Sequence, residues 1–113
     1  MVSKVLILGG SGRSGRSVAA DLLRHTEAAS TLTGRRSQVG FKLHPRQRYQ
    51  SLSLADQGGV RDAIAAHDLV IHCAGPFRTR DFYVLSQCIE QSTPYIDVAD
   101  SPDYVSEALA LHQ

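Results

Sequence analysis

The chain has 113 residues, of which 42% are hydrophobic and 20% charged, and its formal net charge is +1. One soluble globular domain has this size and composition, and no apolar run approaches the roughly 20 residues needed to span a bilayer. With only two cysteines and no signal-peptide pattern, the sequence excludes a membrane protein, a disulfide scaffold and a disordered tail, and it predicts a cytoplasmic protein.

Charge is divided unevenly between the two halves of the chain. Residues 1–50 carry nine Lys and Arg against two Asp and Glu, a net +7, whereas residues 51–113 carry three against nine, a net −6. A basic half within a near-neutral chain indicates a local anionic ligand rather than a long polyanion such as nucleic acid. A solvated basic face is the alternative.

Apolar runs and helical patterns alternate from the N-terminus onward. Residues 4–8 form a continuous apolar run, which predicts a strand buried on both faces, and residues 14–25 carry one apolar stripe of a helix. A β-prone stretch over 30–33 stops at Gly34. The basic, irregular residues 35–48 are predicted to be mostly loop.

The same alternation continues through the second half. Residues 49–54 predict a short strand, and Asp56 is the predicted N-cap of a helix. Further strands are predicted at 69–73 and 95–99, with a helix stripe between them at 84–89. The expected inner side of the helix after Asp56 carries Val60, Ala63, Ile64 and His67.

A last helix is predicted over 104–111, with Pro102 where a first helical turn tolerates it. Five alternations of strand and helix predict an α/β fold with a doubly wound parallel sheet. We expect a Rossmann-type strand order of 3-2-1-4-5 in a single domain over 1–113, truncated after the fifth strand and its helix.

A glycine-rich turn follows the first predicted strand. Gly10, Gly12 and Gly15 fit G-x-G-x-x-G, and the pattern lies between a buried strand and an amphipathic helix. Gly10 is expected to allow the tight turn, Gly12 the approach of a pyrophosphate, and Gly15 close helix packing. A turn that is merely tight is the alternative. The predicted phosphate-binding residues are Gly10, Ser11, Gly12, Arg13, Ser14 and Gly15.

The end of the second predicted strand indicates which dinucleotide is preferred. NAD sites usually carry Asp or Glu about 20 residues after the glycines, but this chain has Gly34, Arg35 and Arg36 there. Guanidinium groups bind a 2′-phosphate, which a carboxylate would repel, so NADP(H) is predicted, with Arg13 as a third contact. A solvated arginine turn is the alternative.

Two weaker candidates complete the predicted cofactor site. Asp56 could bind the adenine amino group, although a helix N-cap explains it equally well. Residues that follow the fourth strand could line the nicotinamide half of the cofactor, or they could form a plain strand-exit turn. These residues are Ala74, Gly75, Pro76 and Phe77.

Catalytic and metal-binding patterns are missing from the sequence. No tyrosine has a lysine four residues later, and the histidines show no metal-ligand spacing. His72 is expected to be a core or cofactor-facing group rather than a catalytic base, and Cys73 and Cys88 to be small core hydrophobes. We therefore predict no catalytic residue and no metal site.

Several blocks of the sequence resemble one family. The glycine turn with Arg16, then Thr33-Gly34-Arg35, is similar to the start of the saccharopine-dehydrogenase-like NADP-binding domain. The later blocks 69–77, 84–90 and 94–100 extend the resemblance over nearly the whole chain. It implies a Rossmann domain that holds the pyrophosphate at Gly10, Gly12 and Gly15 and the adenosine end at Arg35. It also implies that Gly75 and Pro76 approach the nicotinamide.

The resemblance implies an NADP(H)-binding module of an oxidoreductase, in which hydride transfer requires a following substrate domain that this chain lacks. A stand-alone, non-catalytic NADP(H) sensor is the alternative. A binder of S-adenosylmethionine normally needs an acidic residue where Arg35 stands. Because a fifth strand without a sixth neighbour exposes an open edge, we also predict a homodimer through that edge or the adjoining helices.

Overall fold

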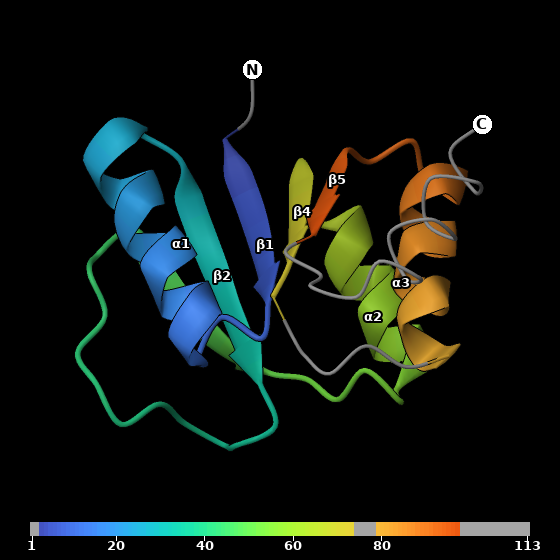
Figure 1. Ribbon diagram of the computed structural model, residues 1–113, viewed down its shortest axis with the longest axis horizontal. Helices are drawn as coiled ribbons and strands as arrows, with labels where there is room; N and C mark the ends of the chain where they lie inside the picture. The colour runs from blue at the N-terminus through green and yellow to red at the C-terminus, as the bar shows by residue number, and fades with distance from the viewer. Residues whose placement is uncertain (1–2, 74–78, 98–113) are drawn as a thin grey trace.

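The computed structural model describes residues 3–73 and 79–97, which form one five-stranded parallel sheet with three helices (Figure 1). The sheet has the order β3-β2-β1-β4-β5, so the predicted topology is confirmed. The strands are β1 (Lys4–Leu8), β2 (Ala29–Gly34), β3 (Gln47–Ser51), β4 (Leu69–His72) and β5 (Tyr95–Asp97). The helices are α1 (Arg13–His25), α2 (Gln57–Ala65) and α3 (Thr79–Glu90).

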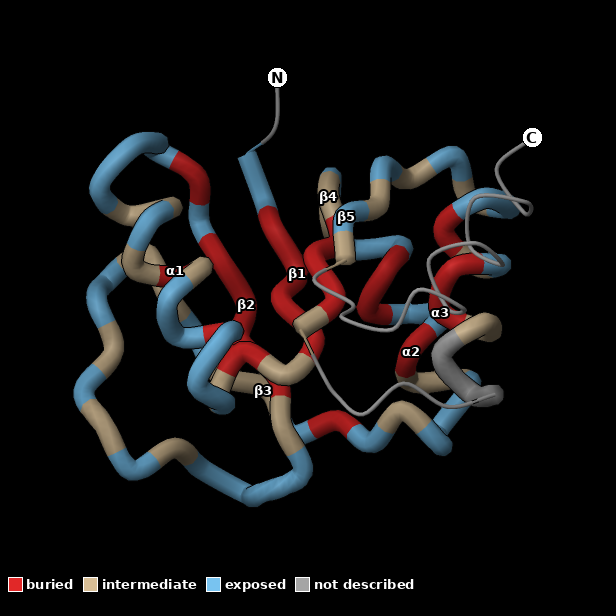
Figure 2. The backbone as a smooth tube through the Cα atoms, in the orientation of Figure 1, coloured by how far each residue is buried: buried red, intermediate tan, exposed pale blue. Residues whose placement is uncertain are grey.

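Helices cover both faces of the sheet, with α1 on one face and α2 and α3 on the other (Figure 1). Side chains alternate along a strand, so β1 supplies two separate cores. Val5 and Ile7 pack in the cluster that contains Ala19 of α1, whereas Leu6 and Leu8 pack with residues of α2 and α3. Buried residues therefore concentrate on the central strands and on the inner sides of the helices (Figure 2).

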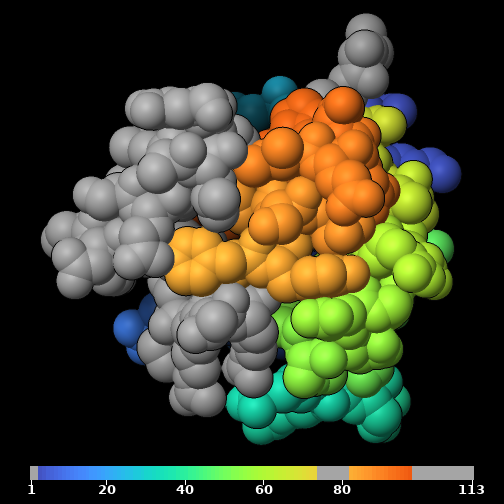
Figure 3. All heavy atoms as spheres, turned by 90° about the vertical axis from the view of Figure 1, so that its right-hand side faces the viewer, coloured from blue at the N-terminus to red at the C-terminus, as the bar shows by residue number. Residues whose placement is uncertain are grey.

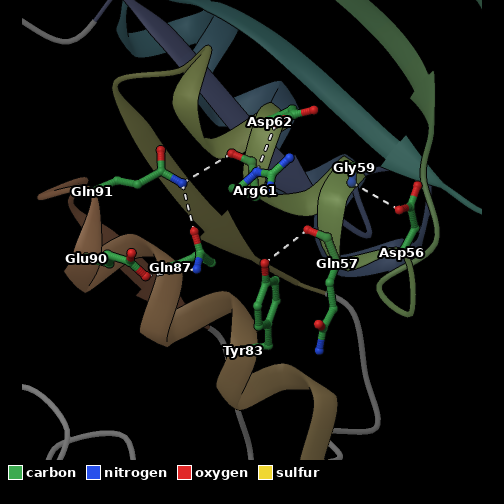
Figure 4. Close-up of polar contacts among 9 residues, drawn as sticks. All are labelled: Asp56, Gln57, Gly59, Arg61, Asp62, Tyr83, Gln87, Glu90 and Gln91. Atoms are coloured by element: carbon green, nitrogen blue, oxygen red, sulfur yellow. Dashed lines mark hydrogen bonds and ion pairs between the residues drawn. The ribbon is translucent and has the colours of Figure 1, made fainter.

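Helices α2 and α3 lie side by side on their face of the sheet (Figure 3). Polar contacts support their apolar packing, as Figure 4 shows. The Tyr83 hydroxyl donates to the carbonyl oxygen of Gln57 at 3.1 Å, and the side-chain amide of Gln91 donates to the carbonyl of Arg61 at 3.2 Å. These bonds hold the first residue and the middle of α2 against α3 and the residue that follows it.

The long connection between β2 and β3 has little regular structure but is held at its end. The Arg46 guanidinium donates to the carbonyl oxygens of Leu23 and Thr26, where α1 ends, at 2.9 and 2.6 Å. It also reaches the carbonyl of Ala28 at 3.4 Å. The carbonyls of Leu23 and Thr26 lie at the end of α1, where carbonyl groups lack an intrahelical partner. The Arg46 side chain therefore caps α1 and also holds the end of the connection against the helix.

The predicted strand over 49–54 was wrong at both ends. Gln47 and Arg48 pair with Ser30 and Thr31 of β2, so β3 begins two residues earlier than its apolar pattern suggested. The chain leaves the sheet after Ser51 to reach the start of α2. A short edge strand with few buried side chains carries a weak pattern, which explains the error.

Two side chains differ from the helical patterns that predicted them. His67 lies beyond the end of α2 rather than on its stripe, and its ring contacts Ala63 and Thr31. Ile89 of α3 is 41% exposed, although it completes the apolar stripe. The predicted residues 74–77 and 98–113 lie outside the described residues. No helix in the described part of the chain is long and apolar enough to cross a membrane.

Candidate functional site

The turn after β1 places a glycine in the left-handed region. Gly9 has φ 74°, a conformation that residues with a Cβ rarely adopt. The amide of Gly10 donates to the carbonyl of Ile7 at 3.1 Å, and that of Gly12 donates to the carbonyl of Gly9 at 3.0 Å. Gly10, to which the sequence assigned the tight turn, lies in both of these turns, and the positive φ belongs to its neighbour Gly9.

Gly10 and Gly15 are required by close packing. A Cβ at Gly10 would lie 2.8 Å from the Cα of Leu32 on β2, and one at Gly15 would overlap the carbonyl oxygen of Gly9. Real Cβ atoms do not approach backbone atoms so closely. Gly15 therefore lets the first turn of α1 rest directly on the glycine turn, as close helix packing requires.

Gly12 differs from both, because it faces open space. A Cβ there would touch only the Gly9 carbonyl oxygen, at 3.4 Å, and the residue is exposed. Gly12 is the N-cap of α1 and offers no side-chain cap, and the first turn of the helix carries no acidic residue. The N–H groups and positive dipole end of α1 are thus available to an anion.

A cavity of about 480 Å³ lies at this turn, at the carboxyl ends of the strands. Ligands of open α/β sheets bind at this edge. The predicted residues that line it are Ser11, Gly12, Arg13, Ser14, Gly34 and Arg35. Lining residues that the sequence did not single out are Gly9, Thr33, Leu52, Ser53, Leu54 and Cys73. Among the described residues, two arginines and no carboxylate line this glycine-turn cavity, which suits a phosphate-bearing ligand.

Thr33 fastens β2 to the glycine turn. Its hydroxyl accepts from the amide of Gly9 and donates to the carbonyl of Ile7, both at 3.3 Å. The amide of Ser11 donates to the carbonyl of Thr33 at 3.4 Å. The signal in the sequence is a threonine directly before Gly34, at the end of the predicted strand. The structure shows that this threonine is buried.

The other two predicted residues on the adenosine side lie elsewhere. Arg36 lines a neighbouring cavity, where its carbonyl accepts from the Tyr49 hydroxyl at 2.7 Å. Asp56 accepts from the amide of Gly59 at 3.0 Å, so it is the N-cap of α2. Contact of either side chain with a dinucleotide stays a prediction.

Burial governs the surroundings of Cys73, Cys88 and His72. Burial raises the pKa of the Cys73 thiol to about 11 and that of Cys88 to about 12, so both are protonated near neutral pH. His72 is fully buried, and its ring meets the edge of Tyr95 with centroids 6.3 Å apart. Cys88 and His72 are therefore core side chains, whereas Cys73 is only partly buried and lines the glycine-turn cavity. The described residues contain no cluster of three metal-ligating side chains.

A cavity of similar size, about 470 Å³, lies at the opposite end of the sheet. Lys4, Thr31, Arg48 and His67 are among its lining residues, and they come from the amino-terminal parts of the strands and from the end of α2. Among the described residues, its lining includes Gly59 in the first turn of α2, but the Asp56 side chain already accepts from that amide. The glycine-turn cavity is therefore the better candidate site.

Comparison with known proteins gives a family match over nearly the whole chain. The family model described as saccharopine dehydrogenase NADP binding domain matches residues 5–113. An Arabidopsis thaliana protein named "Probable mitochondrial saccharopine dehydrogenase-like oxidoreductase" is 24% identical over 92% of this chain. The chain spans only 27% of the length of that relative.

Solved structures share the fold at low sequence identity. A short-chain dehydrogenase/reductase from Veillonella parvula in complex with NADP superposes with a TM-score of 0.73 and 20% identity, over 86% of this chain and 47% of that one. The Bordetella bronchiseptica enzyme WbmH in complex with NAD+ has a TM-score of 0.68 and 20% identity, over 82% and 37% of the two chains. Both likenesses establish the Rossmann fold.

Proposed function

The chain belongs to the saccharopine dehydrogenase NADP-binding domain family, and we propose that it holds NADP(H) in the glycine-turn cavity for an oxidoreductase. When bound, the nicotinamide would supply or accept a hydride. The residues of this chain would bind and orient the dinucleotide. The substrate and the catalytic groups would come from outside these 113 residues.

One observation carries this proposal: the bare backbone at Gly12 stands at the uncapped start of α1. Space in front of Gly12 lets a pyrophosphate approach the N–H groups without meeting a side chain. Arg13 and Arg35 line the same cavity and would neutralise phosphate charge. In this proposal Gly75 and Pro76 approach the nicotinamide half, as in the family.

The first experiment compares NADPH and NADH binding by calorimetry, in the natural chain and in an Arg35→Ala, Arg36→Ala double variant. A hydrogen bond to a charged group is worth about 1.5–3 kcal/mol, so NADPH should bind at least about tenfold more weakly to the variant. NADH affinity should barely change, because NADH lacks the 2′-phosphate.

Exposed Arg24, at the far end of α1, gives the control for that experiment. An Arg24→Ala variant should bind both dinucleotides as the natural chain does. Equal weakening of NADPH and NADH in the double variant would contradict the assignment of the two arginines to the 2′-phosphate. A natural chain that binds neither dinucleotide would contradict the proposed function itself.

A stand-alone NADP(H) sensor is the second candidate function. It is favoured by the described lining of the glycine-turn cavity, which contains no His, Asp, Glu, Lys or Tyr that could transfer a proton. A sensor would change its association with a partner when NADP(H) binds. An oxidoreductase module would instead support hydride transfer once joined to a substrate domain.

Self-association and a cytoplasmic location stay predictions. In the described sheet β5 pairs only with β4, and Ile96 on β5 is 52% exposed, which supports association through this edge. Sedimentation at tens of micromolar (about the range used for such tests) would detect a dimer. The unpaired thiols of Cys73 and Cys88 favour a reducing compartment.

A further inference from the structure

The cavity of about 470 Å³ at the amino-terminal end of the sheet has features of a second binding site. It lies against β3, which is one edge of the described sheet, and residues of α2 form another of its walls. We call it the edge cavity. Its volume is within the range of about 300–1,000 Å³ that is usual for small-molecule sites.

The edge cavity exists because the helices on the α2 face pack over β1 and β4 rather than over β2 and β3. Among the described residues, the apolar cluster beneath α2 and α3 contains none from β2 or β3. Leu32 of β2 and Tyr49 of β3 pack on the α1 face. Side chains alternate along a strand, so the neighbouring Thr31 and Arg48 lie on the α2 face. Polar side chains from both strands therefore line the floor of the edge cavity.

Two cations flank this floor. Lys4 of β1 and Arg48 of β3 line the cavity on strands that lie two strand spacings, about 10 Å, apart, a gap that two long side chains can close around one anion. Within the described residues neither side chain forms an ion pair. The carboxylate of the described lining, Asp62, accepts from the Arg61 guanidinium at 3.1 Å (Figure 4). The positive charge is thus not balanced by a direct partner, and it attracts an anion.

The inner wall of the edge cavity carries two polar side chains that contact each other. Thr31 is buried, and its hydroxyl lies 2.8 Å from Nε2 of His67. Nδ1 of His67 lies 2.6 Å from the carbonyl oxygen of Ala63. Because a carbonyl oxygen only accepts, Nδ1 carries the proton of the neutral ring, and Nε2 accepts from the Thr31 hydroxyl. The imidazole is therefore held in one orientation at the cavity.

We propose that the edge cavity binds a small organic molecule through a tetrahedral oxyanion headgroup, as in a phosphate or sulfate monoester. Lys4 and Arg48 bind separate oxygens of the headgroup from two sides. The apolar part of the ligand lies against Pro45, Ala63 and Ala66, which also line the cavity. This site is separate from the glycine-turn cavity, and the inference does not depend on the proposed function.

The first test is a nuclear magnetic resonance titration of the full chain with phenyl phosphate, with and without saturating NADPH. Amide shifts should occur around Thr31, Arg48 and His67, and they should persist when NADPH is present. Inorganic phosphate, which lacks the apolar part, should bind at this place at least about threefold more weakly. Phenyl sulfate distinguishes a phosphate preference from a general preference for the oxyanion.

Neutral variants with matched controls identify the two cations. Arg48→Gln and Lys4→Gln should each weaken phenyl phosphate at least about fivefold. Arg24→Gln on α1 and Lys42→Gln in the connection between β2 and β3 remove the same charges at exposed positions, and should change the affinity less than about twofold. Thermal unfolding without ligand identifies any variant that fails to fold, and the shift map of the natural chain then decides the location.

The pH dependence of binding gives an independent measurement at His67. Burial lowers the pKa of His67 below 6.5, and Arg48 and Lys4 lower it further. Asp68 and the carbonyl at Nδ1 oppose this shift, and Asp62 on α2 faces the same cavity. An anion bound between the two cations offsets their charge, so it raises the pKa of His67 and binding takes up a proton.

Benzenesulfonate is the probe for this measurement, because its charge stays constant between about pH 5 and 8 while that of His67 changes. Its affinity for the natural chain should rise as the pH falls below about 6.5, and this rise should be absent in His67→Gln. An affinity that does not change with pH in the natural chain would show that no anion lies beside His67, and would overturn the inference.

The other outcomes are equally distinct. If phenyl phosphate shifts only amides around Gly12, or if NADPH displaces it completely, it binds at the glycine turn and the inference is overturned. Equal affinities in Arg48→Gln and Arg24→Gln would also overturn it. A chain that binds NADPH but not phenyl phosphate leaves the proposed function standing alone. Binding of phenyl phosphate at the edge cavity without binding of any dinucleotide would support the inference and contradict the proposed function.

Discussion

At the scale of single residues, Gly12 and Gly15 belong to one motif but have different physical roles. The space at Gly12 is open to solvent, whereas the space at Gly15 is already filled by the backbone of the glycine turn. The same added methyl group should therefore affect binding at one position and folding at the other.

Gly12→Ala should leave the free energy of unfolding within about 0.5 kcal/mol of the natural value, because its backbone angles suit alanine. NADPH affinity should fall at least about tenfold, because the methyl group would stand between the backbone and the pyrophosphate. Gly15→Ala should lower the free energy of unfolding by about 1–3 kcal/mol through overpacking. Urea unfolding and calorimetry measure the two quantities.

Gly58→Ala is the control, because a Cβ there would meet only ordinary contacts at 3.9 Å, on α2. It should bind NADPH normally. Should Gly12→Ala also bind NADPH normally, the pyrophosphate does not approach the backbone at that residue.

The sequence predicted where the glycines of the site lie, but not the reason for each. The pattern G-x-G-x-x-G has fixed spacing, whereas the positive φ of Gly9 and the close approach of Gly10 to Leu32 of β2 appear only in the folded chain. The contact of Arg16 with Phe41 could not be predicted, because in a helix pattern Arg16 is simply an exposed charged residue. Only the folded loop brings Phe41 beneath it.

At the scale of elements, Asp56 separates a structural role from a binding role. Its carboxylate accepts from the Gly59 amide and so caps α2. Asp56→Ala should lower the free energy of unfolding by about 0.5–2 kcal/mol, while Asp56→Asn, which can still cap, should lower it less. Both variants should bind NADPH as the natural chain does, as calorimetry would measure.

A specific loss of NADPH affinity in Asp56→Ala, beyond any loss of folding, would instead favour the adenine contact that the sequence left open. Urea midpoints measured beside the calorimetry show whether the variant is folded at the temperature of the binding experiment. If Asp56 only caps α2, the two variants differ in their free energy of unfolding and not in NADPH affinity. If Asp56 also contacts adenine, Asp56→Ala loses NADPH affinity as well.

Secondary structure could be predicted for the elements that carry a strong pattern. Strand β1 is buried on both faces, and its predicted bounds were correct. A short continuous apolar run is stable only where both of its faces are covered, which is the position of a central strand. Strand β3 was misplaced, because Gln47 and Arg48 are polar and are held in the sheet by pairing with β2. That pairing is a long-range contact, which a local pattern does not contain.

At the scale of the whole molecule, His67 links stability to pH. Its ring lies 2.6 Å from the Ala63 carbonyl and 2.8 Å from the Thr31 hydroxyl, between the end of α2 and the sheet. Burial lowers the pKa of His67 below 6.5, and Arg48 on β3 and Lys4 on β1 lower it further, whereas Asp68 and the carbonyl oppose the shift. Asp62 on α2 also lines this region.

The unfolded chain therefore takes up a proton on His67 at a higher pH than the folded chain does. Its neutral form favours folding fully above about pH 6.5, and this contribution falls as the pH drops below that value. Urea unfolding at several pH values should show the decrease in the natural chain and a smaller decrease in His67→Gln.

Exposed His25 gives the control, because His25→Gln should retain the natural pH dependence. Asp68 also makes stability depend on pH, but in a more acidic range than His67. The backbone amides of Ser3 and Lys4 donate to its carboxylate and lower its pKa, so the stabilisation is lost only when the pH falls far enough to protonate the carboxylate. An unchanged slope between neutral pH and about pH 5 in His67→Gln would exclude His67 as the group responsible.

The segment between Arg36 and Arg46 is fastened at both ends without being part of the sheet. Tyr49 secures its beginning, and the Arg46 side chain secures its end to the exit of α1. Between these anchors, Phe41 and Leu43 pack against the core on the α1 face of the sheet. This stretch therefore folds together with the domain, and a polar residue in place of Phe41 or Leu43 would cost stability as well as alter the surface beside α1.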